Sequence, residues 1–342
     1  MLKKLMGGLT GRAKAAAPVV PVPAGPDVPP PKPNRPTGMA LALQGGGSLG
    51  AFTWGVLDRL LDEPDFAPLR LSGASAGAVN ATAFACGWAA GGAAGARDAL
   101  ERIWHRVGEC GAESLGFCPT WANNGMVRAA NNAAFQFATR FFSPYALNPL
   151  GINPLRDILS AELDFDALRQ KAAPRLFISA TRVSDGGACV FSNGQIGLDV
   201  LLASTTLPTL HQAVDIDGEA YWDGGYTLNP PVAALLDGPA IGDILVVQAM
   251  PNRTATVPRT ATAIRERLNE ITFSRPLEAE MDLVREKLNH RDRPERLSLL
   301  AIDPASEGMG NLSGLRVDRD YLLMLKAHGR AQAESWLRRS GP

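Results

Sequence analysis

A Gly-x-Ser-x-Gly pentapeptide, Gly73-Ala74-Ser75-Ala76-Gly77, stands where a short apolar segment gives way to a long alanine-rich one. The apolar stretch Leu69–Ser72 predicts a buried strand, and Ala78–Ala90 predicts a helix that begins near the serine. A serine at such a sharp turn needs strained backbone angles, and small residues two positions away let strand and helix close around it. On its own, the pentapeptide fits equally well with a glycine-rich helix start that has no chemical role.

A second glycine-rich loop follows the first predicted strand. The apolar run Met39–Gln44 predicts a buried strand, Ala51–Leu61 has helical spacing, and glycines lie between them. A phosphate-binding loop would end in Gly-Lys-Ser/Thr, which is absent, although the glycine spacing also permits a dinucleotide fingerprint. Beside a serine turn, glycines suit an oxyanion hole, because residues without a Cβ let backbone amides approach a tetrahedral oxygen. The candidate oxyanion residues are Gly45, Gly46 and Gly47.

Further strands alternate with helices along the chain. An Asp-Gly-Gly turn predicts a hairpin between two β-rich runs, and later apolar runs predict additional strands. Strands interleaved with helices indicate an α/β fold with a central, mostly parallel sheet between helical layers. The predicted strands are Arg175–Val183, Ala188–Ser192, Asp243–Met250 and Leu297–Ile302, and the predicted helices are Arg97–Val107, Ala261–Asn289 and Val317–Arg338.

The sequence divides into three regions. Residues 1–37 form a Pro/Ala-rich tail that we expect to be disordered, without the apolar core of a signal peptide, although its first nine residues could anchor weakly at a membrane surface. Residues 38–250 are the expected catalytic domain, with an insertion or lid at 108–153. Residues 251–342 are expected to add helices and one further strand, packed on the same domain. Apolar residues of the insertion fit either lipid access or ordinary core: Met126, Val127, Phe135, Phe137, Phe141 and Phe142.

Charge and cysteine content exclude several classes of protein. Lys plus Arg equals Asp plus Glu at 34 each, so nucleic acid is not an expected partner. The span between Arg70 and Arg97 lacks charged residues, but its glycines and polar residues favour a buried helix over a membrane span. The four cysteines lack paired spacing, which predicts free thiols in a reducing, cytoplasmic setting: Cys86, Cys110, Cys118 and Cys189.

A catalytic serine needs a base, and the histidines are poorly placed for that role. Two of the four lie in charged helical segments, whereas His211 lies near a loop and stays a candidate. Asp223, preceded by two aromatic residues and followed by two glycines, could be aimed from a tight, partly apolar turn at a neighbouring hydroxyl. Taken alone, the same residues fit a plain Asp-Gly turn.

Taken together and in order, the Gly-Gly-Gly-x-x-Gly, Gly-x-Ser-x-Gly and Asp-Gly-Gly motifs resemble the patatin-like phospholipase family. The resemblance covers about Leu41 to Val247. The Tyr-Trp-Asp-Gly-Gly form of the third motif is similar to that of one bacterial branch. Further matching segments are Ala203-Ser204, Leu207-Pro208, Asn229-Pro230, Phe141-Phe142-Ser143-Pro144 and Ile271-Thr272-Phe273.

The resemblance implies a three-layer αβα fold and a Ser-Asp dyad that hydrolyses acyl esters of lipids without a metal or cofactor. Ser75 would be the nucleophile and Asp223 the base. Leu49 stands where many members have a basic residue, which suggests a preference for neutral or less anionic esters. The supporting glycines would be Gly73 and Gly77 in the serine turn, Gly45, Gly46 and Gly47 in the oxyanion loop, and Gly224 and Gly225 after the aspartate.

These features leave three hypotheses open. The first is a lipid acyl hydrolase in the cytoplasm or peripherally bound at a membrane, acting through an acyl-enzyme on Ser75. The second is a binding scaffold at lipid or polyester granules that retains a hydrolase fold, although such a scaffold has no need of Ser75, Asp223 and the glycine loop together. The third is a triad that depends on His211.

Overall fold

The computed structural model describes residues 38–114, 141–254, 257–290, 295–303 and 312–340. The proline-rich tail, Cys118 and most of the apolar residues of the predicted insertion lie outside these ranges. Two of those insertion residues are described, and their side chains are exposed rather than part of the core: Phe141 at 68% and Phe142 at 57%.

An eight-stranded, mixed sheet forms the centre of the fold, which confirms the predicted α/β class with a mostly parallel sheet. Five strands pair in parallel in the order β3-β2-β1-β7-β8, while β4, β5 and β6 pair antiparallel at the β3 end. The bounds are β1 Met39–Leu43, β2 Pro68–Gly73, β3 Arg175–Arg182, β4 Ala188–Ser192, β5 Val214–Ile216, β6 Glu219–Asp223, β7 Asp243–Gln248 and β8 Arg296–Ala301.

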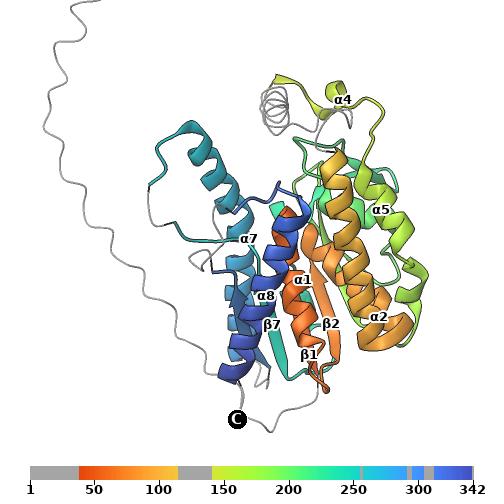
Figure 1. Ribbon diagram of the computed structural model, residues 1–342, viewed down its shortest axis with the longest axis vertical. Helices are drawn as coiled ribbons and strands as arrows, with labels where there is room; N and C mark the ends of the chain where they lie inside the picture. Colours follow the sequence, from red (N-terminus) through yellow and green to blue (C-terminus); the bar gives the residue numbers. More distant parts are fainter. Residues whose placement is uncertain (1–37, 115–140, 255–256, 291–294, 304–311, 341–342) are drawn as a thin grey trace, which may run out of the picture.

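Helices cover both faces of the sheet (Figure 1). Successive residues of a strand point to opposite faces, and the two larger hydrophobic clusters follow this alternation. Leu41 and Leu43 pack with α1, α2 and α8, whereas Ala40 and Ala42 pack with α7 on the other face. The helices are α1 Gly50–Leu60, α2 Ala76–Ser114, α4 Pro144–Leu147, α5 Pro154–Glu162, α6 Leu198–Thr205, α7 Ala261–His290 and α8 Arg319–Ser340.

Most predicted elements are present, with boundaries that shift by a few residues. The two helical segments expected after the serine form one element, α2, interrupted where Gly91 and Gly92 leave helical backbone angles. The first part of α2 is buried, as predicted for the charge-free span. No helix within the described ranges is long and apolar enough to span a bilayer. The short helices α5 and α6 and the strands β5 and β6 were not predicted, since each offers too few residues to show a period.

Helix α8 packs closely along α1, side by side in Figure 1. A Cβ atom at Gly55 of α1 would lie 2.0 Å from the carbonyl oxygen of Lys326, so the two backbones approach to a distance that only glycine allows. An ion-pair network joins the same helices. Arg330 of α8 binds Asp58 of α1 and Asp62 in the turn that follows it, and Arg97 of α2 binds both carboxylates as well. Three helices on one face of the sheet are thereby fixed together.

Candidate active site

Ser75 lies at the turn between the end of β2 and the start of α2. Its φ of 52° is in the left-handed region, which a residue with a side chain rarely adopts. The neighbouring glycines allow the turn to close: a Cβ at Gly73 would lie 2.5 Å from the Gly77 carbonyl oxygen, and one at Gly77 would lie 1.9 Å from the Leu43 carbonyl oxygen. The predicted strand-turn-helix arrangement around the serine is therefore present, with the strain localised on Ser75 itself.

A hydrogen bond from another helix holds this strained residue. The backbone N–H of Ser75 donates to the hydroxyl of Ser204 at 3.0 Å, and Ser204 is fully buried near the end of α6. Ser75 remains slightly exposed, at 9%. The turn is thus supported from α6, a helix that the sequence pattern did not reveal.

Strands β2 and β6 end at neighbouring positions on β3. β2 pairs in parallel as far as Gly73 opposite Ile178, and β6 pairs antiparallel down to Asp223 opposite Ala180. Because β4 pairs along the whole of 177–181, it occupies one edge of β3, and β2 and β6 must share the other. The carboxyl-terminal ends of β2 and β6 therefore meet, which brings the serine turn and the aspartate together.

The Asp223 carboxyl is completely buried at this junction. Burial raises its pKa from 3.8 to about 7, and the Ser75 hydroxyl and the Gly225 amide only partly offset the cost of the buried charge. Oδ1 accepts from the Gly225 N–H at 2.7 Å, whereas Oδ2 has no hydrogen-bond partner among the described residues. The proximity of Ser75 lowers the pKa, yet the hydroxyl does not complete a hydrogen bond to Oδ2. The carboxyl therefore has one oxygen fixed and one available.

The two glycines after Asp223 allow the chain to turn tightly against β3 and α7. A Cβ at Gly224 would lie 2.2 Å from the Ser179 carbonyl oxygen, and one at Gly225 would lie 2.5 Å from the ring of Phe273. The backbone of Asp223 is anchored on both sides, since its N–H donates to the Thr206 carbonyl at 2.9 Å and its carbonyl accepts from the Thr181 hydroxyl at 2.8 Å. The aspartate thus closes a strand, rather than lying in the loop that the sequence predicted.

The glycine loop lies against the serine turn. A Cβ at Gly45 would lie 2.7 Å from the Cβ of Ser75, so only glycine fits there. The Gly45 N–H donates to Asn229 Oδ1 at 2.8 Å, and the Asn229 amide donates in turn to the Phe273 carbonyl at 2.8 Å. Asn229 is fully buried and joins the loop to α7. Asn229 belongs to the Asn229-Pro230 segment that contributed to the family resemblance, but its contact with Gly45, 184 positions away, was not predictable.

Three backbone amides near Ser75 remain available. No hydrogen bond among the described residues uses the N–H of Gly46, Gly47 or Ala76, whereas that of Gly45 is occupied. Ala76 is the first residue of α2, where amides lack partners within the helix. Unpaired amides beside a serine and a buried carboxyl can stabilise negative charge that develops on a bound carbonyl oxygen.

Comparison with known proteins identifies the family of this chain. A family model for patatin-like phospholipases matches residues 41–236, more than half of the chain. The chain belongs to the patatin-like phospholipase family. The match contains the glycine loop, the serine turn and the Asp-Gly-Gly turn at 223–225. Membership of this family implies a lipid acyl hydrolase. A comparison with curated protein sequences gave no significant match.

Two solved structures of bacterial proteins are similar to this patatin-like chain. VipD from Legionella pneumophila aligns with a TM-score of 0.41 and 16% identity over 89% of this chain and 67% of VipD. ExoU of Pseudomonas aeruginosa, in its complex with SpcU, aligns with a TM-score of 0.41 and 15% identity over 90% of this chain and 52% of ExoU. This chain thus spans about half the length of ExoU, and the scores are too low to carry more than a general likeness.

A C-terminal segment of this patatin-like protein covers the glycine loop, which the sequence did not indicate. The Ser48 N–H donates to the Gly314 carbonyl at 2.9 Å, and the Ser48 hydroxyl donates to the Ser313 carbonyl at 2.9 Å. A Cβ at Gly47, whose φ is 60°, would lie 2.1 Å from the Gly314 oxygen. Leu49, expected to mark a missing cation, has its side chain buried in the core under α1.

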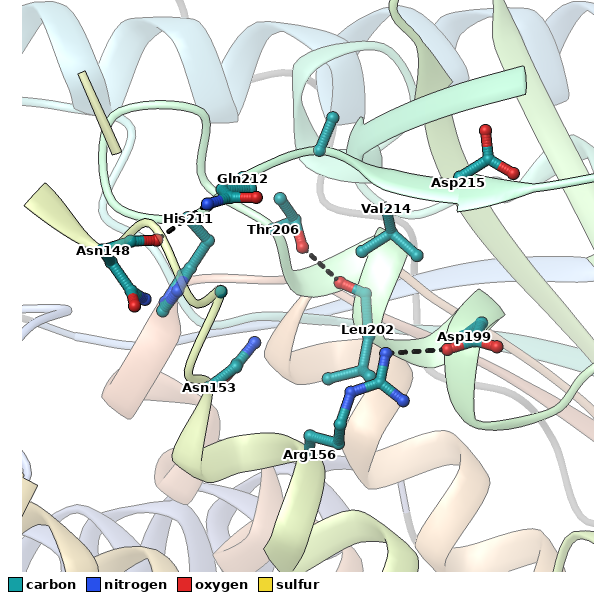
Figure 2. Close-up of a pocket in the computed structure, with 12 residues that line it drawn as sticks. Asn148, Asn153, Arg156, Asp199, Leu202, Thr206, His211, Gln212, Val214 and Asp215 are labelled. Atoms are coloured by element: carbon teal, nitrogen blue, oxygen red, sulfur yellow. Dashed lines mark hydrogen bonds and ion pairs between the residues drawn. The ribbon is translucent and has the colours of Figure 1, made fainter. Parts of the chain in front are cut away.

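His211 does not join the serine and the aspartate. It lines a separate cavity of about 220 Å³, shown in Figure 2, whose walls include neither Ser75 nor Asp223. Burial lowers the pKa of its imidazole, and the ring makes no hydrogen bond with any described residue. Nothing in this arrangement couples His211 to the hydroxyl of Ser75.

Proposed function

We propose that the protein is a serine acyl hydrolase that cleaves acyl esters of lipids, with Ser75 as nucleophile and Asp223 as general base. The observation that carries the proposal is the meeting of a strained, slightly exposed serine with a fully buried carboxyl at the shared edge of β3. Strain and a strongly shifted pKa cluster at functional sites more often than elsewhere. The family membership supplies the reaction class and the lipid substrate.

The arrangement supports a two-step reaction. Asp223 accepts the proton of the Ser75 hydroxyl through Oδ2, while the serine oxygen attacks the acyl carbonyl carbon. Collapse of the tetrahedral intermediate breaks the ester bond, and the proton on Asp223 passes to the departing alcohol. A water molecule then gives a proton to Asp223 and attacks the acyl carbon, and this proton passes to the Ser75 oxygen as the acyl-enzyme bond breaks and the fatty acid leaves. A pKa of about 7 suits a group that must both accept and return a proton near neutrality.

We assign the oxyanion hole to the amides of Gly46, Gly47 and Ala76 rather than to the whole glycine triplet. Gly45 is engaged by Asn229, so its role is to hold the loop against Ser75. Losing one such donor typically costs about 10²- to 10³-fold in kcat. The bonds that join the glycine loop to α7 and to the C-terminal segment keep these amides oriented before the substrate binds.

Active-site labelling tests the proposal directly. A fluorophosphonate probe should label the wild-type protein and Ser160→Ala, a control at an exposed serine of α5, but not Ser75→Ala. Turnover of a p-nitrophenyl ester should be lost in Asp223→Asn and retained in Asp282→Asn, a control at an exposed carboxylate of α7. A wild-type protein that is neither labelled nor active would instead support the granule-binding scaffold.

A third outcome concerns the histidine. If His211→Ala abolished p-nitrophenyl ester turnover while Asp223→Asn did not, the dyad would be wrong and a histidine-dependent triad would replace it. The separation of His211 from both Ser75 and Asp223 argues for the opposite result.

A further inference from the structure

The cavity that contains His211 lies next to the support of the dyad. It opens between the α4–α5 connection, helix α6 and the segment that leads to β5 (Figure 2). At about 220 Å³ it is smaller than the roughly 300–1,000 Å³ of sites that enclose drug-sized ligands. Most of the residues that line it are polar or charged, which is the wrong chemistry for an acyl chain. The cavity suits a small polar group.

Several polar groups of the cavity have no partner among the described residues. Asn153 uses Oδ1 to cap α5 by accepting from the Leu155 N–H at 3.1 Å, which leaves its amide nitrogen as a donor. Gln212 donates to the Asn148 carbonyl at 2.7 Å, which leaves its Oε1 as an acceptor. The imidazole of His211 offers one donor and one acceptor in its neutral form. Donors and acceptors arranged around a small hollow match hydroxyl groups, which do both.

The charges around the cavity oppose an anionic ligand. Arg156 is the one cation among the described residues that line the cavity; it binds Asp199 at 2.8 Å, and both side chains are about half exposed. Asp215 adds a further carboxylate, and burial keeps the pKa of His211 below its ordinary value, so the imidazole is neutral at pH 7. A phosphate placed here would find no unpaired cation among the described lining residues, so the free-energy cost of removing its charge from water would not be offset. An uncharged polyol would not carry that cost.

Two residues of one short segment connect the cavity to the reaction centre. Ser204 accepts from the N–H of Ser75, and Thr206, two residues later, accepts the N–H of Asp223 while its side chain lines the cavity. A group held in the cavity is therefore positioned by the same end of α6 that positions the dyad. Thr206 is thus shared between the support of Asp223 and the lining of the cavity.

We infer that this cavity is the binding site for the alcohol portion of the substrate and that it takes an uncharged polyol, either glycerol or a sugar. The inference rests on the proposed hydrolase function and narrows its substrate class to acylglycerols or acyl sugars, in preference to lipids with an anionic headgroup. The hydroxyl-matching groups are His211, Gln212 and Asn153.

Matched substrates test the inference. The wild-type enzyme should hydrolyse a 1-monoacylglycerol at least tenfold more efficiently, in kcat/KM, than the 1-acylglycerol 3-phosphate with the same acyl chain. A 6-O-acylglucoside of that chain length then distinguishes glycerol from sugar as the natural headgroup. Equal or faster turnover of the phosphate ester overturns the inference.

A substitution in the cavity tests the residues. In His211→Leu, the ratio of KM for the monoacylglycerol to KM for the p-nitrophenyl ester of the same chain should rise about 3- to 10-fold, as expected for the loss of one neutral hydrogen bond. His211→Gln, which restores a donor and an acceptor, should recover most of the wild-type ratio. His328→Leu on α8 is the control and should leave both KM values unchanged. A rise in both KM values by the same factor in His211→Leu would mean a structural role only.

Direct binding separates this inference from the proposed function. In Ser75→Ala protein, glycerol added during NMR titration should shift the side-chain amide signals of Asn153 and Gln212, whereas sn-glycerol 3-phosphate at the same concentration should not. If the wild-type enzyme hydrolysed no ester at all, the hydrolase proposal would fail while this titration still decided the polyol site. Amide signals that glycerol leaves unmoved overturn the site.

Discussion

Replacing Asp223 with asparagine should make the protein more stable while removing its activity. The carboxyl is fully buried, and burial raises its pKa from 3.8 to about 7, so the folded protein resists its ionisation. Asparagine has the same shape and can still accept the Gly225 N–H through Oδ1, the bond that measures 2.7 Å in the wild type. The substitution therefore removes the ionisable group with little change in packing.

The size of the effect follows from the two pKa values. Each tenfold change in an ionisation constant corresponds to about 1.4 kcal/mol, so a rise from 3.8 to about 7 corresponds to about 4 kcal/mol. Between these values the unfolded chain has released the proton while the folded protein retains it, so the wild type loses stability as pH rises. Below pH 3.8 the carboxyl is protonated in both the folded and the unfolded state, so it does not change the free energy of unfolding. Above pH 7 the full destabilisation by the buried, ionised carboxylate is reached.

Urea unfolding followed by circular dichroism at half-unit steps from pH 4.5 to 8.5 would measure this. Over this range the free energy of unfolding of Asp223→Asn minus that of the wild type should increase with pH by about 3 kcal/mol, the part of the effect that lies above pH 4.5, and level off above pH 7. Asp282→Asn, an exposed control, should show no such trend. A difference that stays constant across the range would refute the assignment of a buried, hard-to-ionise base.

Wild-type kcat/KM should rise about tenfold per pH unit up to about pH 7, because the base must be ionised.

Three further substitutions test the support of the site and the helical layer. Asn229→Ala should lower kcat at least tenfold and the urea midpoint as well, because buried groups of the glycine loop and α7 lose their partner. Gly55→Ala should cost about 1–3 kcal/mol in urea unfolding through a clash with α8, whereas Gly91→Ala, at a position with no atom within 4 Å, should cost far less. Arg330→Leu should lower the urea midpoint at pH 7, and this deficit should shrink as acid protonates Asp62, whose pKa lies below 3.8.

Local patterns made the serine turn predictable. Gly73 and Gly77 are needed within a few residues of Ser75, and the strand and helix on either side have their own short-range signals. The order of strands and helices gave the fold class for the same reason. Alternation and helical periodicity are properties of contiguous segments, so they can be read without knowing which strands are neighbours.

Long-range pairing could not be read in this way. Asp223 was identified from its two glycines and the family resemblance, but its position at the end of β6, on the edge of β3 that β2 also uses, depends on three separate strand pairings. The partner of the Gly45 amide is 184 residues away. The polyol cavity likewise combines residues of separate elements, and none of them is distinctive in its local sequence.

The position of strand β7 limits how far this protein can be shortened from its C-terminus. It begins at Asp243, after the family match ends at residue 236, yet it pairs with β1 along its length, and its Val247 carbonyl accepts the Gln44 N–H at 3.0 Å just before the glycine loop. A fragment cut at the end of the match would turn β1 into an unpaired sheet edge, a template for aggregation. Recombinant shortening, domain grafting and searches for the smallest active unit should therefore keep β7, and the close packing of α8 on α1 extends this requirement to the end of α8.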